Sequence, residues 1–148
     1  MKIMFFLLVV MGSFSVWAEE QIIPSPFELA LIQHESRGDD KAIGDKNLSQ
    51  KAYGCLQIRQ PACDDINQRY GTNYRAEDCL GNRDLSLTIL RLYIRIWATE
   101  KNLERQPTLE DYARIWNGGP KGHLKTSTKQ YWQDVQDIYG QLLATQKK

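Results

Sequence analysis

The sequence has few residues of the kinds that bind metals, and it has no excess of charge of one sign. Its 148 residues include only two histidines and three cysteines, and 19 basic residues nearly balance 18 acidic ones. His34 and His123 lie far apart in the sequence, and no paired-cysteine motif accompanies them, so a zinc signature is missing. A nearly neutral chain cannot hold nucleic acid by charge alone. We therefore expect no metal, no cofactor and no nucleic-acid partner.

Long hydrophobic runs are also missing, except near the N-terminus. Lys2 is followed by an apolar run from Ile3 to Met11, and Val16 and Ala18 offer small residues at the usual cleavage positions. This run is too short for a bilayer, which needs about 20 apolar residues. The pattern predicts a signal peptide over residues 1–18, cleaved after Ala18, and a short lead over 19–25. We expect a periplasmic or secreted protein without a stable membrane anchor.

The remaining length accommodates one domain, over residues 26–145, and its patterns are mainly helical. Ser25, Pro26 and Glu28 form a capping box that predicts a helix to about Arg37, ended by Gly38. The polar stretch 39–52 indicates a loop or short hairpin, and 53–58 an extended segment. Further helices are expected over 61–70, over 82–101 as the central and most buried helix, from 108 to about 118, and from 127 onward.

Export to an oxidising compartment predicts that two of the three cysteines form a disulfide and that one remains as an odd thiol. The candidates are Cys55, Cys63 and Cys79, and the sequence does not select the pair. A catalytic cysteine would need a positioned histidine nearby. We therefore expect a structural role for the cysteines.

The sequence contains four short motifs. Their order and spacing identify a family more specifically than any single motif does. Glu35-Ser36 ends the first helix, Tyr53-Gly54-Cys55-Leu56-Gln57-Ile58 follows about twenty residues later, and Trp116-Asn117-Gly118-Gly119-Pro120 precedes the segment Thr128 to Trp132. Together they resemble the lysozyme-like lytic transglycosylase domain of the SLT type, which is related to goose lysozyme. The resemblance covers about Pro26 to Leu142. It implies a mainly α lysozyme-like fold with a short β or loop segment forming one wall of a cleft.

The chemistry of Glu35 agrees with this resemblance. Cleavage of a glycosidic bond needs a carboxylic acid that stays protonated near neutral pH, so its pKa must be raised. Glu35 lies at the end of an apolar helix stripe and at the negative end of the helix dipole, and both features disfavour its charged form. The resemblance makes Glu35 the catalytic acid and then base, and it implies substrate contacts for Tyr53, Gly54, Gln57, Trp116, Asn117 and Tyr131. Trp116 departs from the family's usual tyrosine, and Ser127 stands where many members have a glutamate.

A second carboxylate decides between two reactions. A hydrolase needs one, either to activate water or to act as the nucleophile, and the candidates are Asp39, Asp40 and Asp45. A lytic transglycosylase needs none, because the C6 hydroxyl of muramic acid attacks the anomeric carbon.

The sequence favours a monomeric lytic transglycosylase that acts on peptidoglycan glycan strands and leaves 1,6-anhydroMurNAc ends. A lysozyme-type muramidase on the same fold is the alternative, and a non-catalytic peptidoglycan-binding module is a third. The biological role, and whether cleavage is internal or at strand ends, stay open.

Overall fold

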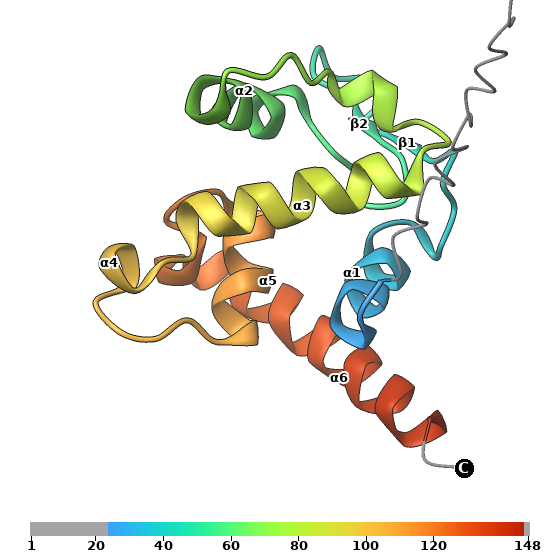
Figure 1. The fold of residues 1–148 in the computed structure, drawn as a ribbon. Coiled ribbons are helices and arrows are strands. Elements are labelled where there is room, and N and C mark those ends of the chain that lie inside the picture. Colours follow the sequence, from blue (N-terminus) through green and yellow to red (C-terminus); the bar gives the residue numbers. More distant parts are fainter. Residues whose placement is uncertain (1–23, 147–148) are drawn as a thin grey trace, which may run out of the picture.

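The computed structural model describes residues 24–146, and the predicted signal peptide lies outside these residues. The chain is mostly helical with one small antiparallel sheet (Figure 1), so the predicted fold class is confirmed. None of the helices in the described part is both long and apolar enough to cross a membrane. The elements are α1 (Pro26–Ser36), β1 (Ile43–Gly44), β2 (Ala52–Tyr53), α2 (Gln60–Tyr70), η1 (Ala76–Cys79), α3 (Arg83–Trp97), α4 (Glu100–Leu103), α5 (Leu109–Gly118), η2 (Gly122–Leu124), η3 (Thr126–Thr128) and α6 (Lys129–Thr145).

Helix α1 begins at the capping box that the sequence predicts. The backbone N–H of Glu28 donates to Ser25 Oγ at 3.3 Å, and the N–H of Ser25 donates back to Glu28 Oε2 at 2.7 Å. The same Glu28 carboxylate accepts a hydrogen bond from Arg91 Nε of α3 at 2.6 Å, which ties the start of α1 to the central helix. At the other end, Arg37 adopts the left-handed conformation, one residue before Gly38. The direction of α1, and with it the position of Glu35, is therefore set at both ends.

Helix α3 runs through the middle of the molecule, between α2 and the hairpin on one side and α5 on the other (Figure 1). Leu87, Ile89 and Leu90 are fully buried, as expected for the central helix. The prediction that this helix continues to residue 101 is wrong, because it ends at Trp97. The Thr99 hydroxyl accepts from the N–H of Asn102 and so begins a separate short helix, α4.

The segment after α1 forms the short hairpin that the sequence allowed. Ile43 pairs with Tyr53 and Gly44 pairs with Ala52 in an antiparallel register. Residues 53–58, however, form a tight turn and not an extended segment. The N–H of Tyr53 donates to the Ile58 carbonyl and the N–H of Ile58 donates to the Tyr53 carbonyl, both at 2.9 Å. The turn is made possible by left-handed backbone at Gly54 (φ 74°) and Gln57 (φ 51°).

Helix α6 packs along α1, and its buried face includes Tyr131 and Val135. The helix begins at Lys129, slightly later than predicted, because residues 126–128 form a 3₁₀ turn. The Thr128 hydroxyl accounts for this entry: it accepts from Arg114 Nε of α5 at 3.0 Å and donates to the Gly122 carbonyl at 2.7 Å. These contacts fix the start of α6 against α5.

The three cysteines are free thiols, so the predicted disulfide is not formed. All three are fully buried in the hydrophobic core. Burial raises the pKa of Cys55 and of Cys63 to about 11 and that of Cys79 to about 12, so each is a protonated, apolar core side chain. The core is continuous around them without a covalent link.

Substitution of Gly54 tests the tight turn. A Cβ at this position would lie 2.4 Å from the Cys79 carbonyl oxygen, and the residue has positive φ. We expect Gly54→Ala to lower the free energy of unfolding by about 2–4 kcal/mol in urea denaturation. Gly71→Ala is the matched control, since Gly71 has a similar φ of 68° and open space around it, and it should cost only about 1 kcal/mol. Equal losses in the two variants would contradict the close approach at Gly54.

Candidate active site

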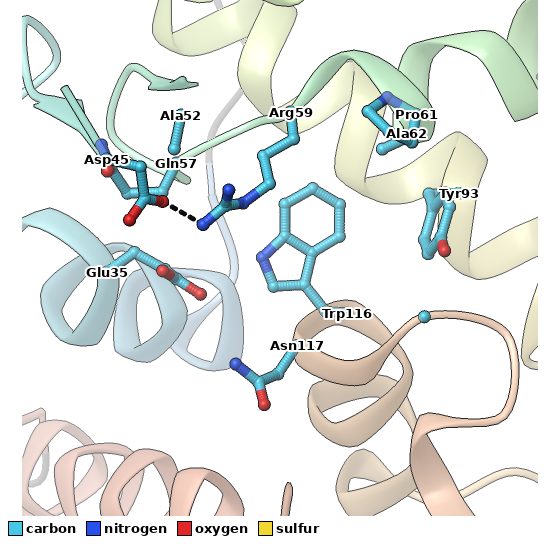
Figure 2. Close-up of a pocket in the computed structure, with 11 residues that line it drawn as sticks. Glu35, Asp45, Ala52, Gln57, Arg59, Pro61, Ala62, Tyr93, Trp116 and Asn117 are labelled. Atoms are coloured by element: carbon cyan, nitrogen blue, oxygen red, sulfur yellow. Dashed lines mark hydrogen bonds and ion pairs between the residues drawn. The ribbon is translucent and has the colours of Figure 1, made fainter. Parts of the chain in front are cut away.

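The structure has a cleft of about 360 Å³. The hairpin and the start of α2 form one wall, and the end of α5 forms the other. Its floor includes Tyr93 of α3, and the end of α1 supplies Glu35 (Figure 2). A volume of this size is typical of small-ligand sites. The lining residues are Glu35, Asp45, Ala52, Gln57, Arg59, Pro61, Ala62, Tyr93, Trp116, Asn117 and Gly119.

Glu35 lies in the last turn of α1, and its carboxyl reaches the cleft from below (Figure 2). Desolvation raises the pKa of this carboxyl above its ordinary value. A hydrogen bond from Tyr131, the nearby His34 and Arg59, and the Trp116 indole all act in the opposite direction, but burial outweighs them. The site therefore holds a carboxyl that retains its proton at higher pH than a surface glutamate.

Tyr131 supports Glu35 from beneath. Its hydroxyl donates to Glu35 Oε1 at 2.7 Å, and the His34 ring packs edge-on against the phenol with centroids 4.6 Å apart. Burial raises the pKa of Tyr131 well above its usual range, so the hydroxyl stays a donor. Tyr131 is 7% exposed and is not among the cleft-lining residues, which argues against the predicted substrate contact. It orients the catalytic candidate from below.

Of the three candidate second carboxylates, Asp45 alone lines the cleft. It follows β1, has left-handed backbone (φ 49°), and forms an ion pair with Arg59. Asp39 accepts from the N–H of Lys41 at 2.8 Å in an exposed turn and is not among the cleft-lining residues. Asp40 does not line the cleft either, and its carboxylate accepts from Arg83 Nε at 2.8 Å, which fastens the loop to α3.

Gln57 lines the cleft from the tight turn. Its Nε2 donates to the Gly54 carbonyl at 3.0 Å, which fixes the side chain across the turn. Its Oε1 lies close against Gly44, where an added Cβ would be only 2.1 Å away. The left-handed backbone of Gln57 and the absent side chain at Gly44 together place the amide beside Asp45 (Figure 2).

The opposite wall is built by the end of α5. The Trp116 indole lines the cleft and also contacts the core, with its ring edge-on to Tyr93 at 5.8 Å between centroids. Asn117 is exposed at the rim below it (Figure 2). The indole is thus held firmly enough to act as an apolar surface for a flat ligand.

Two residues predicted to contact substrate lie elsewhere. Tyr53 lines a separate depression with Gln60 and Arg75 and is not among the residues that line the cleft with Glu35. Gly54 is buried under the Cys79 carbonyl and shapes the turn, without lining the cleft.

Arg59 and Tyr93 line the cleft although the sequence motifs did not indicate them. Arg59 directly follows the Gln57-Ile58 motif, and this adjacency was the available signal. Tyr93 carried no separate signal, since it falls within the apolar pattern of α3. Within the described part of the chain, no cluster of three metal-ligand side chains occurs.

The fold is that of a lysozyme. The crystal structure of Meretrix lusoria lysozyme in complex with Aeromonas hydrophila PliI matches 78% of this chain and 90% of its own, with a TM-score of 0.65 and 22% identity. Tapes japonica lysozyme matches with a TM-score of 0.64 and 23% identity, over 78% of this chain and 89% of its own.

The sequence comparison gives the family. The lysozyme of Ostrea edulis is 30% identical over 115 residues, which cover 65% of this chain and 81% of the oyster protein. The chain therefore belongs to the lysozyme family. No family model matches the sequence. The resemblance to lytic transglycosylases predicted the lysozyme-like fold correctly. The family it implied is corrected, because the relatives are lysozymes.

The raised pKa of Glu35 predicts a pH-dependent gain in stability for Glu35→Gln. As pH rises above about 4.3, the carboxyl ionises in the unfolded state before it ionises in the folded state, so the parent loses stability relative to the glutamine variant. Gln can still accept from Tyr131. We expect Glu35→Gln to raise Tm by roughly 2–5 °C at pH 7 and by less at pH 4, measured by calorimetry. The same Tm difference at both pH values would contradict a desolvated Glu35.

Tyr131→Phe tests the support beneath Glu35. Loss of the hydroxyl removes a hydrogen bond that favours the carboxylate, so the pKa of Glu35 should rise further. If Glu35 is the acid, the alkaline limb of the activity profile should move to higher pH, and kcat should fall about 3- to 30-fold as the carboxyl loses its orientation. Tyr139→Phe, on the same helix, is the control. An unchanged profile in Tyr131→Phe would count against this role.

Proposed function

We propose that the protein is a lysozyme, a muramidase that hydrolyses the β-1,4 bond between MurNAc and GlcNAc in peptidoglycan. The observation that carries this proposal is a cleft lined by two carboxyl groups in different surroundings. Glu35 is desolvated with a raised pKa, whereas Asp45 lies at the exposed edge of the cleft beside a cation. The kinship with the Ostrea edulis lysozyme supports the same conclusion.

The two groups would divide the reaction between them. Protonated Glu35 donates its proton to the leaving glycosidic oxygen, and the sugar ring acquires oxocarbenium character. The Asp45 carboxylate lines the same cleft and has one of two roles. It either takes a proton from the water molecule that attacks the anomeric carbon, or attacks that carbon itself to form a glycosyl ester, which a water molecule deprotonated by Glu35 then hydrolyses. The Trp116 indole and the Gln57 amide would hold the sugar, one by its apolar face and one by hydrogen bonding.

Asp45 is the reason for preferring hydrolysis to the transglycosylase reaction. A lytic transglycosylase can work with one glutamate, because its substrate supplies the attacking hydroxyl. Here the cleft keeps a second carboxylate at its edge, with left-handed backbone and an arginine partner. A hydrolase gives this second group a role, whereas a transglycosylase does not need it.

The setting of the enzyme follows from the proposed reaction. We infer a protein that acts outside the cytoplasm, in the periplasm or after secretion, on glycan strands, as a monomer and without a cofactor. The Meretrix lusoria lysozyme of similar fold binds the inhibitor PliI. A protein inhibitor of this type would be a partner here as well, and it would compete with substrate if it covers the cleft.

The test is a digest of purified peptidoglycan, with the released muropeptides weighed by mass spectrometry. The parent protein should release products with reducing MurNAc ends, which are one water heavier than 1,6-anhydroMurNAc products. Glu35→Gln should lose at least about 10³-fold in rate, and Asp45→Asn at least about 10-fold, because each removes a group used in the transition state.

Asp39→Asn is the matched control, since this carboxylate lies in an exposed turn outside the cleft and its loss should leave the rate unchanged. Anhydro products from the parent would overturn the hydrolase assignment in favour of a transglycosylase. Full activity of Glu35→Gln would overturn the assignment of the acid.

A further inference from the structure

Arg59 is the one cation among the cleft-lining residues, and it joins two points of the loop that carries Asp45. Its Nη2 pairs with Asp45 Oδ2, and its Nη1 donates to the Gln50 carbonyl at 3.2 Å. Arg59 itself occupies the N-cap position of α2, and its side chain makes no capping hydrogen bond there. One side chain therefore reaches from the start of α2 to Asp45 (Figure 2) and to Gln50, the two ends of the 45–50 loop.

This loop has little packing of its own. Residues 45–51 are all exposed, and the N–H of Leu48 donates to the Asp45 carbonyl at 2.8 Å in a local turn. Asp45 has left-handed backbone, which costs a residue with a side chain about 1 kcal/mol or more unless the surroundings hold it. The guanidinium, with donors in a fixed planar fork, suits that task better than a flexible ammonium would.

We propose that Arg59 is a positioning residue, which holds the 45–50 loop and so fixes the Asp45 carboxylate in the cleft that contains Glu35. The inference rests on the proposed function, in which Asp45 is the second carboxylate. In this proposal Arg59 affects kcat through the position of Asp45.

The same cation influences Glu35. Arg59 is among the charges that lower the pKa of the Glu35 carboxyl, against the larger effect of burial. The other titratable groups around Glu35 are His34 on its own helix, Tyr131 on α6 and Asp45 across the cleft. Asp134 on α6 faces His34, with 3.6 Å between carboxylate and Nε2. Loss of Arg59 removes a cation, and this change favours the protonated form of Glu35.

The central experiment compares Arg59→Ala and Arg59→Lys with the parent in peptidoglycan hydrolysis across pH. Arg59→Ala should lower kcat roughly 10- to 100-fold through misplacement of Asp45, and move the alkaline limb of kcat/KM to higher pH. Arg59→Lys keeps the positive charge but lacks the planar guanidinium group. The alkaline limb of its kcat/KM profile should therefore match that of the parent, whereas its kcat should lie between those of Arg59→Ala and the parent. Arg69→Ala, an exposed arginine of the same helix outside the cleft, is the control and should match the parent.

Folding is not expected to obscure these results. The Arg59 and Asp45 side chains are 45% and 35% exposed, and exposed pairs contribute little to global stability. The Tm of Arg59→Ala should therefore lie close to that of the parent. Amide hydrogen exchange in residues 45–51 supplies a readout independent of activity, and it should become faster in Arg59→Ala and not in Arg69→Ala.

A double-mutant cycle with Asp45→Asn tests whether Arg59 acts through Asp45. In the Asp45→Asn background, Arg59→Ala should lower kcat by no more than about 2- to 3-fold further. Three results would each overturn the positioning role. They are losses of kcat that multiply in the double variant, an unchanged kcat in Arg59→Ala, and unchanged amide exchange in residues 45–51 of Arg59→Ala. An inactive parent protein would instead refute the proposed function, and the exchange measurement would still decide whether Arg59 holds the loop.

Discussion

The contact between Tyr131 and Glu35 is the interaction on which the site depends, because it joins two helices through residues that are 96 positions apart in the sequence. The capping box and the Glu28–Arg91 contact fix the start of α1, and Thr128 fixes the entry into α6. Packing of α1 against α6 then encloses the Glu35 carboxyl on one side, while the cleft leaves it accessible on the other. Desolvation raises the pKa of this group, and the phenol hydroxyl limits that rise and sets the direction of the carboxyl.

The cleft has contrasting environments at its two edges. Glu35 comes from the end of a packed helix, whereas Asp45 comes from an exposed loop and is paired with Arg59. Acid–base chemistry needs this contrast, since two carboxyl groups in equal surroundings could not divide the roles of proton donor and carboxylate. In the proposed function, the fold separates these two roles, because the two carboxyl groups come from different elements and contact different partners.

The parts of this structure that could be predicted from sequence are those encoded by neighbouring residues. The capping box gave the start of α1, and the apolar stripe before Glu35 gave its burial.

The tight turn at 53–58 escaped prediction because it needs left-handed backbone at Gln57, a residue with no such preference. The sequence motif marked Tyr131 as a site residue, but it did not predict the hydrogen bond to Glu35, because that contact joins distant helices. The same applies to Asp45, which local sequence could not separate from Asp39 and Asp40. Fully buried cysteines gave no signal that they would stay unpaired, and the motifs that marked the cleft did not distinguish lysozymes from lytic transglycosylases.

The most direct test of the central claim is a titration of the side-chain carboxyl carbons by NMR, with Glu35 assigned from Glu35→Gln. The account predicts that Glu35 titrates clearly above the ordinary glutamate value of about 4.3 and after the exposed carboxyl groups. It also predicts that Tyr131→Phe moves this titration to still higher pH. A Glu35 carboxyl that titrates together with the surface glutamates would contradict a desolvated acid, and with it the division of roles in the cleft.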